Sequence, residues 1–459
     1  MIDTEVMQEY LNKKDSLSKT AVNFINRLCD KGSFVELNMF TSGNDGNAIS
    51  CGYARISDRV VFVYAFNHDV NQGALSQRDI SVVLDIFSKA KATGTPVIGI
   101  LHCDGLKLEQ NLQAADGWGR LIKAATDCSG IVPHIMYVEG AALGLVGMYS
   151  QCADILLLDK EATIGIGTSQ SCMITAEDCG ANGTASILTD KSNVIADIKR
   201  VLSYFPDNCN AIHEGLDATD DINRRCDDLS IGCSAMQIIN SVFDQGSYLP
   251  LYDNFATDVL TGFVSIGGTA AVVVSNNNNL ISADGSRKIT RVLKLANAYG
   301  LPVITLCNTE GFEACKECEA QGILAQDASL AMTFSSLSVP LITVITGHAI
   351  GNAYVAMGSK SLGADIVYAW VGSEIGLISA EAAIAIGQGE KVADSQDPIL
   401  YRKQLIQEYK NKQMNVYVAA QSGLIDQPIL PKDTRAYIAA AVDCMINKNI
   451  ISNNAILPI

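Results

Sequence analysis

The sequence lacks several features that would place it in a membrane or nucleic-acid-binding class. No uninterrupted apolar run reaches the roughly 18 residues that a membrane-spanning helix needs. Positive charge is scarce: 33 Lys and Arg stand against 49 Asp and Glu, so the formal net charge is −16. Because a general nucleic-acid binder needs a basic surface to replace phosphate counterions, this balance argues against nucleic acid as a partner.

The N-terminal residues and the cysteines indicate the compartment. Residues 1–15 carry acids and amides and lack the apolar core of a signal peptide, so we expect a cytoplasmic protein. The 14 cysteines are scattered along the chain, which is typical of free core residues rather than disulfides in a cytosolic protein. Cys315 and Cys318 are spaced like half of a zinc site. No second such pair accompanies them, so we expect two free thiols and no metal.

Motifs for side-chain catalysis are also missing. The sequence contains no G-x-S-x-G, no G-x-x-x-x-G-K-[ST] and no H-E-x-x-H. There are only five histidines. His102 and His134 fall in expected buried strands and are interpreted as hydrogen-bonded core groups, whereas His348 lies in a glycine turn where it can contact a ligand. The chain is therefore poor in acid–base side chains.

What the chain does contain is an internal repeat. With 459 residues and 48% hydrophobic composition it is long enough for two or three domains with large cores. Gly94–Ile98 aligns with Gly300–Ile304 at an offset of 206 residues. Further matches follow in the same order along both halves: 32–34 with 246–248, 52–53 with 262–263, 104–105 with 310–311, 132–133 with 339–340, 140–144 with 347–351, and 153–155 with 364–366. A duplicated domain is therefore expected.

Each half alternates short apolar strands with helices, which indicates parallel βαβ units and an α/β fold. The expected strands are 54–56, 60–65, 97–102 and 135–138 in the first half, and 261–266, 269–275, 303–307 and 341–345 in the second. The expected helices are 80–93 and 143–151, and 287–299 and 351–359. We expect an N-terminal domain over 1–167, a mostly helical linker over 168–245, and a C-terminal domain with a helical tail over 246–459.

Four glycine turns, two in each half, follow these strands at the edge where parallel α/β units carry their chemistry. They are Asp104–Gly105, Gly140–Gly144, Glu310–Gly311 and Gly347–Gly351. Turns that enter helices expose unpaired backbone N–H groups, and two such groups can hold a developing oxyanion. The alternative is that the glycines only allow close packing and tight turns.

Five segments of the C-terminal half then suggest a family. They are Val339–Met357, Ala364–Trp370, Ser373–Gly376, Ser379–Ala383, and Gly423–Asp426 with Pro431–Arg435. These segments resemble the carboxyltransferase subunits of biotin-dependent acyl-CoA carboxylases and decarboxylases, and the N-terminal half resembles them in outline. The resemblance implies two tandem crotonase-like domains related by duplication, which agrees with the repeat.

The resemblance also implies an activity. A carboxyl group would move between carboxybiotin and an acyl-CoA, with one backbone oxyanion hole for the thioester and another for biotin. The implied partners are an acyl-CoA, a separate biotin carboxyl carrier protein, biotin carboxylase or membrane decarboxylase subunits, and further copies of the chain in a dimer-based hexamer. The implied cofactor is biotin on that separate carrier, and no metal is expected.

The family's site residues map onto this sequence by position. Catalytic donors would be Gly105 and Leu106 for the thioester, and Asn352 and Ala353 for biotin. Biotin contacts would also come from Gly311, Phe312 and Gly351, and substrate contacts from Gly140, Ala141, Gly144 and Val355. Asn352 stands where the family has glycine, and Asn is the non-glycine residue that best tolerates positive φ. Val355 is expected to line the acyl pocket, with ordinary core packing as its alternative.

Two other functions stay open at this stage. One is a biotin-independent crotonase-type acyl-CoA hydratase or hydrolase, although no pair of glutamates stands out at the turns. The other is a non-catalytic relative of the carboxyltransferases that keeps only an assembly role.

Overall fold

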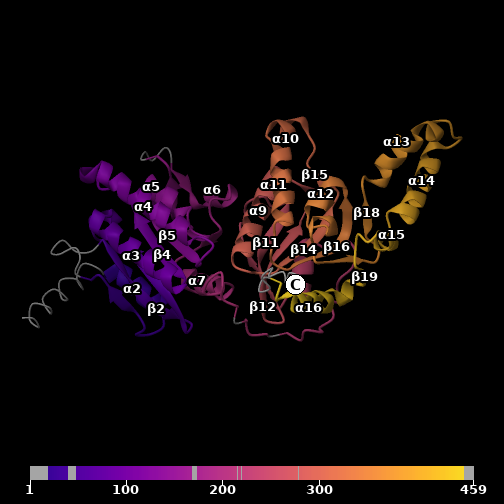
Figure 1. The fold of residues 1–459 in the computed structure, drawn as a ribbon. Coiled ribbons are helices and arrows are strands. Elements are labelled where there is room, and N and C mark those ends of the chain that lie inside the picture. Colours follow the sequence, from indigo (N-terminus) through magenta and orange to yellow (C-terminus); the bar gives the residue numbers. More distant parts are fainter. Residues whose placement is uncertain are drawn as a thin grey trace, which may run out of the picture. The chain divides into compact units, whose positions relative to one another are not determined.

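The computed structural model describes residues 19–39, 48–167, 173–213, 215–218, 220–277 and 279–448. The chain divides into two compact units, Met1–Glu214 (unit 1) and Gly215–Ile459 (unit 2), each built on its own sheet (Figure 1). The segment expected as a linker contributes to both units. Its strand β9 (Ile187–Thr189) extends the sheet of unit 1, and its helix α8 (Ala235–Val242) packs into the core of unit 2.

Unit 1 is a mixed sheet with helices packed against it. Its strands follow the order β1 (Val35–Leu37), β2 (Ile49–Ile56), β3 (Arg59–Phe66), β4 (Val97–Cys103), β5 (His134–Leu143), β6 (Ile155–Asp159) and β9, with β7 (Thr163–Gly165) and β8 (Ile174–Thr175) off this path. The helices are α2 (Lys19–Leu28), α3 (Gln77–Thr93), α4 (Leu112–Cys128), α5 (Leu145–Ser150), α6 (Ala176–Ala181) and α7 (Val194–Ser203).

Unit 2 repeats this arrangement. Its main sheet follows the order β10 (Leu249–Pro250), β11 (Val259–Ile266), β12 (Thr269–Asn276), β14 (Val303–Thr309), β16 (Leu341–Ile350), β17 (Ile366–Trp370) and β19 (Gln427–Ile429), with β18 (Glu374–Gly376) beside β16 and a small sheet of β13 (Leu280–Ile281) and β15 (Gly311–Phe312). The helices after α8 are α9 (Ala283–Ala298), α10 (Lys316–Ala320), α11 (Ile323–Ser335), α12 (Gly351–Ala356), α13 (Ala380–Ala393), α14 (Pro398–Gln413), α15 (Val416–Gln421) and α16 (Thr434–Met445). In Figure 1, α13 and α14 form a helical hairpin that extends away from this sheet.

Matched hydrogen bonds show how closely the two units correspond. Asp154 in unit 1 and Asp365 in unit 2 occupy equivalent positions before β6 and β17. The Asp154 carboxylate accepts the N–H of His134 at 2.9 Å, and the Asp365 carboxylate accepts the N–H of Leu341 at 2.8 Å. Each aspartate thereby fixes the start of the long central strand of its sheet. The predicted duplication of an α/β domain is present in the structure.

Local sequence signals explain where the elements begin and end. Ser76 and Asp79 form a reciprocal capping box at the start of α3, and Gly94 ends that helix with φ +69°. In β4 and β14 every side chain is buried except the sixth, which is half-buried: His102 in unit 1 and Asn308 in unit 2. Parallel strands covered on both faces read as continuous apolar runs, which is why the sequence revealed them.

Two of the four predicted glycine turns are strands instead. Gly140 lies within β5 and Gly347 within β16, and only Gly144 and Gly351 turn the chain into a helix. Both strands continue because their second halves pair with a different neighbour, β7 for β5 and β18 for β16. A change of partner along one strand leaves no periodic signal in the sequence.

The cysteines and histidines partly match expectation. Eleven of the described cysteines are free, but Cys315 and Cys318 form a disulfide, so the prediction of two free thiols there is wrong. His134 is fully buried with its Nε2 3.0 Å from the Tyr64 hydroxyl, which confirms a hydrogen-bonded core group. His102 is only half-buried and stacks on His68, so its interpretation as a core group is wrong.

The described residues contain no helix with both the length and the apolar composition needed to cross a bilayer.

Candidate active site

In unit 1 the predicted thioester donors follow β4 directly. Gly105 and Leu106 are both half-buried, and the preceding Asp104 is anchored by its N–H, which donates to the Gln72 carbonyl at 3.1 Å. A Cβ atom added to Gly105 would meet nothing within 4 Å. The space beside this Cα is therefore open to a ligand, and no packing contact within the chain requires glycine here.

The predicted substrate residues of unit 1 leave the same edge of the sheet. Cys103 of β4 is paired with Ala142 of β5, so Gly140 and Ala141 on β5, and Gly144 directly after it, lie next to the turn at Gly105. Gly144 has φ +59° and ψ −123°, a conformation that side chains other than hydrogen disfavour, and its N–H donates to the Gly165 carbonyl at 2.7 Å. The structure thus gathers the predicted unit 1 residues in one place.

Three further side chains meet at this edge. His68 Nε2 lies 3.0 Å from Asp104 Oδ2, and the His68 and His102 rings stack with their centroids 3.8 Å apart. Burial, followed by the charge of His68, lowers the pKa of His102, which favours a neutral ring. Sequence reasoning missed His68 and Asp104 as a group with His102, because only the pairing of β3 with β4 brings them together.

In unit 2 the predicted biotin donors begin α12. Gly351 carries the positive φ, +65°, while Asn352 is not among the residues with positive φ. The positive φ that favours glycine therefore falls on Gly351, and Asn352 does not have to adopt it. Asn352 is exposed and Ala353 buried, and both belong to the first helical turn, whose N–H groups have no carbonyl four residues earlier within the helix.

Strand β15 packs against α12 and so brings Gly311 and Phe312 beside this helical turn. The Gly311 N–H already donates to Thr309 Oγ1 at 3.2 Å, so the donors left for a ligand are those of α12. Glu310 N–H donates to the Asn279 carbonyl at 2.7 Å, the counterpart of the Asp104 bond in unit 1. The predicted biotin residues are thus also gathered in one place.

Val355 lies on the exposed side of α12. Its side chain is 42% exposed, so the alternative of ordinary core packing is wrong. Its assignment to the acyl pocket stays a prediction.

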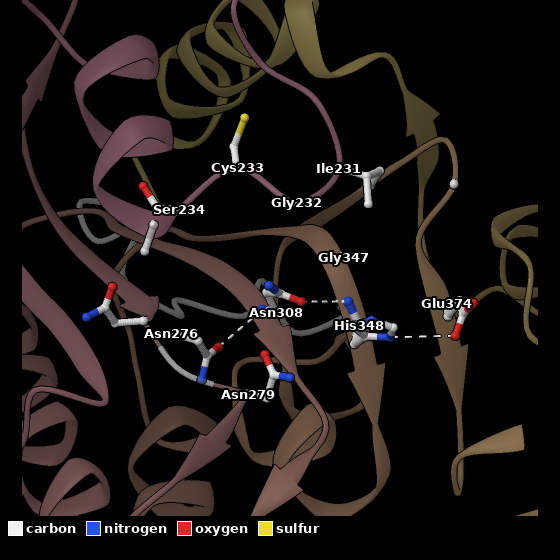
Figure 2. A pocket seen from close by; sticks show the side chains of 13 residues that line it. Ile231, Gly232, Cys233, Ser234, Asn276, Asn279, Asn308, Gly347, His348 and Glu374 are labelled. Carbon is white, nitrogen blue, oxygen red and sulfur yellow. Dashed lines mark hydrogen bonds and ion pairs between the residues drawn. The ribbon is translucent and has the colours of Figure 1, made fainter. Parts of the chain in front are cut away.

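A cavity of about 450 Å³ lies at the ends of β12, β14 and β16, under the loop that precedes α8 (Figure 2). It is lined by Ile231, Gly232, Cys233, Ser234, Ala235, Asn276, Asn277, Asn279, Asn308, Gly347, His348, Gly372 and Glu374. His348, which the sequence singled out, is part of this lining, whereas Gly311, Phe312 and the first turn of α12 are not. Sequence reasoning missed the asparagines, because an amide side chain carries no signal of its own for a site.

The amides in this cavity are oriented by the backbone. Asn308 Oδ1 accepts the His348 N–H at 2.8 Å, and Asn276 Oδ1 accepts the Asn308 N–H at 3.2 Å (Figure 2). Asn276 is 4% exposed and its Nδ2 has no hydrogen-bond partner among the described residues. The cavity therefore presents a buried amide donor to whatever occupies it, since an unpaired buried donor is costly.

Glu374 lies between two basic groups at the other end of the cavity lining. Its Oε2 lies 3.6 Å from His348 Nδ1, and its Oε1 lies 3.0 Å from Lys410 Nζ on α14. The carboxylate is balanced by these partners, so this end of the cavity is polar without being strongly anionic.

Comparisons with known proteins agree with this geometry. The chain is 27% identical over 475 aligned residues to the propionyl-CoA carboxylase carboxyltransferase subunit of Haloferax mediterranei. This alignment covers 95% of this chain and 92% of the relative. It is 27% identical over 459 residues to the methylmalonyl-CoA decarboxylase subunit alpha of Propionigenium modestum, covering 92% and 89% of the two chains. The solved transcarboxylase 12S hexamer with methylmalonyl-coenzyme A and methylmalonic acid bound shares the fold, with a TM-score of 0.88, 24% identity, and coverage of 98% and 94%.

The family model described as the carboxyl transferase domain matches residues 13–455. This match spans both units, and it confirms the family and the carboxyltransferase type of enzyme that the resemblance implied. The likeness to the transcarboxylase 12S structure confirms the fold class. The chain belongs to the carboxyl transferase domain family.

Proposed function

We propose that this chain is the carboxyltransferase subunit of a biotin-dependent acyl-CoA carboxylase or decarboxylase, with the thioester bound in unit 1 and biotin in unit 2. The acyl group is short, because the relatives are named for propionyl-CoA and methylmalonyl-CoA. The biotin is carried by a separate carrier protein, with biotin carboxylase or membrane decarboxylase subunits as further partners, and the cytoplasmic location is the one expected from the sequence.

In unit 1 the turn after β4 receives the thioester. The donors of this turn are the N–H groups of Gly105 and Leu106, next to the open space beside the Gly105 Cα, and their role is to stabilise negative charge on the thioester oxygen. Donors of this kind contribute about 3–4 kcal/mol each to transition-state stabilisation. Gly140 and Ala141 on β5 form the neighbouring wall, and Gly144 positions the start of α5.

In unit 2 the first turn of α12 fits a ureido oxygen. The N–H groups of Asn352 and Ala353 are unpaired within the helix, and β15 supplies Gly311 and Phe312 beside them. When bound, carboxybiotin supplies both the carboxyl group and the base that takes the α-proton of the thioester. The chain then has to bind and orient the two reactants and exclude water from them, which agrees with the lack of G-x-S-x-G and H-E-x-x-H motifs in the sequence.

The observation that carries this proposal is the repetition of one device. Each unit has a turn after the fourth strand of its main sheet, β4 or β14, anchored by the same backbone bond, from Asp104 to Gln72 and from Glu310 to Asn279. Each unit also has a short helix entered through a glycine of positive φ, Gly144 or Gly351. Transfer between a thioester and the ureido group of biotin needs one oxyanion hole for the oxygen of each group.

We further propose that copies of the chain assemble as a dimer-based hexamer. Transcarboxylase 12S is described as a hexamer assembly, and it shares this fold over nearly the whole chain. In such an assembly the thioester half of one subunit faces the biotin half of another.

The two alternatives predict different products. A hydratase or hydrolase would act on acyl-CoA without biotin, and a non-catalytic relative would act on neither. The experiment is to incubate the purified chain with methylmalonyl-CoA, with and without free biotin, and to follow propionyl-CoA and free CoA by chromatography. Biotin-dependent propionyl-CoA supports the proposal. Free CoA released without biotin, or hydration of an added enoyl-CoA such as crotonyl-CoA without biotin, supports the crotonase-type alternative, and no conversion in any arm supports the non-catalytic one.

A further inference from the structure

A histidine and carboxylate cluster lies at the edge of unit 1, outside the groups that the proposed chemistry uses. His68 follows the end of β3 by two residues, His102 is the sixth residue of β4, and Asp104 comes directly after β4. Strands β3 and β4 are parallel neighbours, so their carboxyl ends bring these three side chains together. One ligand atom from each lies within 4.8 Å of the others.

We propose that His68, His102 and Asp104 form a binding site for a divalent transition-metal ion. Two imidazoles and one carboxylate are a donor set that first-row metals such as Co²⁺, Ni²⁺ and Zn²⁺ accept, with the remaining positions open to water. Imidazole and carboxylate ligands lie about 2.0–2.2 Å from such an ion, so two ligands of one ion are at most about 4.4 Å apart. In a tetrahedral site neighbouring ligand atoms are about 3.3–3.6 Å apart, so the cluster, whose ligand atoms lie within 4.8 Å of one another, must contract by up to about 1–1.5 Å on binding.

The surroundings leave room for this arrangement. A Cβ atom on Gly140 would come within 2.4 Å of His102 Nε2, so glycine at this position of β5 is what allows the His102 ring to lie where it does. The His68 side chain is 32% exposed and the Asp104 side chain 40% exposed, so both can rotate and water can reach the remaining positions of an ion.

The His68 and His102 rings stack at an interplanar angle of 20°. Near-parallel rings direct their in-plane lone pairs along similar directions, so binding requires rotation of one imidazole. Because the His102 ring packs against Gly140, rotation of the more exposed His68 and Asp104 side chains is the smaller adjustment. We therefore expect micromolar rather than nanomolar affinity.

The local charge favours a cation. Asp69 and Asp104 both act electrostatically on His102, opposed by Lys191, and Glu139 on β5 interacts with His68 and Lys191. Asp159 and Arg27 also act on Glu139, so four carboxylates and two cations leave this edge negative, and a divalent ion would offset that charge. A bound ion would also tie the end of β3 to the turn at Gly105. Any effect of this link on the thioester turn rests on the proposed function, whereas metal binding itself does not.

The test is a titration of the full-length chain with CoCl₂ after treatment with EDTA and dialysis, followed by visible absorption and isothermal titration calorimetry. Free cysteines elsewhere in the chain can also bind metals, and Co²⁺ reports this because thiolate ligands add an intense near-ultraviolet band. We expect one equivalent with d–d absorption and without that band. A stoichiometry near zero up to 1 mM CoCl₂, or binding only with the thiolate band, would overturn the proposal.

Three variants assign the ligands, and a fourth is the matched control. His68→Gln, His102→Gln and Asp104→Asn should each weaken Co²⁺ binding by about tenfold or more, since metal sites depend strongly on each ligand. His348→Gln removes a histidine of unit 2 and should leave binding unchanged. All four need a parental far-ultraviolet dichroism spectrum. If the three cluster variants fold and bind Co²⁺ like the parent, the ion is held elsewhere and the assignment is wrong.

Discussion

Two glycines of the candidate site, Gly105 and Gly140, differ in what a side chain at their position would meet, and this difference yields a prediction. Gly105 has open space where a side chain would stand, whereas Gly140 has the His102 ring there at 2.4 Å. Gly105→Ala should therefore fold with parental stability and lower the rate of transfer from acyl-CoA, because the methyl group occupies the substrate's space. Gly140→Ala should instead lower the melting temperature. Melting curves and steady-state kinetics of both variants check this.

Gly119 provides the control for this pair. It is exposed on α4, and a Cβ there would meet nothing within 4 Å. Gly119→Ala should raise stability by up to about 1 kcal/mol through helix propensity and leave transfer unchanged. A Gly105→Ala variant with parental kinetics would mean that the thioester does not approach this turn.

A half-buried aspartate gives a pH-dependent prediction. Asp327 on α11 accepts the Ser286 hydroxyl at 2.9 Å, and burial raises the pKa of its carboxyl to about 6. Because this folded-state pKa lies above the unfolded value, the group's favourable contribution is complete below about pH 4 and is lost as the pH rises through 6. Asp327→Asn keeps the acceptor without the charge. It should melt higher than the parent at pH 7.5, and the difference should shrink at pH 4.5; an equal difference at both values would contradict this origin.

At the scale of elements, one buried ion pair joins three segments of unit 2. Arg435 at the start of α16 is fully buried and donates to Asp244 Oδ1 at 2.6 Å, to the Val242 carbonyl at 2.8 Å and to the Asp221 carbonyl at 3.0 Å. Asp244 also accepts the N–H groups of Gly267 and Gly268 in the β11–β12 turn. The pair therefore holds the C-terminal helix, the end of α8 and this hairpin together.

Arg435→Met should destabilise unit 2 by about 3–5 kcal/mol, because it leaves the buried Asp244 carboxylate without its counter-charge and two carbonyls without the Arg435 donor. Urea unfolding followed by circular dichroism measures this cost. Lys123→Met is the control, since its pair with Asp127 is exposed on α4 and such pairs contribute at most about 1 kcal/mol. Equal effects of the two substitutions would show that the buried pair does not hold these three segments together.

The first turn of α12 can be tested without breaking the helix. Asn352→Pro removes one proposed oxyanion donor, and proline is tolerated in a first helical turn because its N–H has no partner within the helix. We expect a loss of roughly 10²–10³-fold in biotin-dependent transfer, with acyl-CoA binding unchanged. Asn352→Gly should retain activity, since the backbone donor survives. A folded proline variant that transfers at the parent rate would make this turn only structural.

The sequence predicted the elements that are periodic and repeated, and missed those defined by tertiary pairing. Strands β4 and β14 were found because their side chains are buried on both faces, and the repeat doubled the signal. The continuation of β5 through Gly140 was missed, because small residues in a strand read as a turn. The residues that are proposed to act through their backbone N–H groups were located by the resemblance to the family. Asn276 and His68 depend on contacts between distant segments, so sequence spacing could not reveal them.

At the scale of the whole molecule, the helical hairpin of unit 2 carries apolar residues that nothing within the described part of the chain covers. Ile386 on α13 is 81% exposed and Ile399 on α14 is 74% exposed, and Leu377 in the segment that leads into α13 is 82% exposed. None of the residues of α14 is buried, although a helix of 16 residues normally buries one face. Apolar surface of this extent is typical of a protein–protein interface, and it agrees with the proposed assembly of several copies.

If this hairpin is an interface between copies, and if the thioester half of one subunit faces the biotin half of another, then assembly and transfer must be lost together. Ile386→Glu with Ile399→Glu places two charges on the hairpin without touching either core. We expect the double variant to sediment as a monomer that still binds acyl-CoA through unit 1, with biotin-dependent transfer reduced to background. Ile212→Glu is the matched control, because Ile212 is 73% exposed in unit 1 and outside the hairpin. A monomeric double variant that transfers at the parent rate would show that one chain contains a complete site. A double variant that keeps the parent's sedimentation coefficient would place the interface elsewhere.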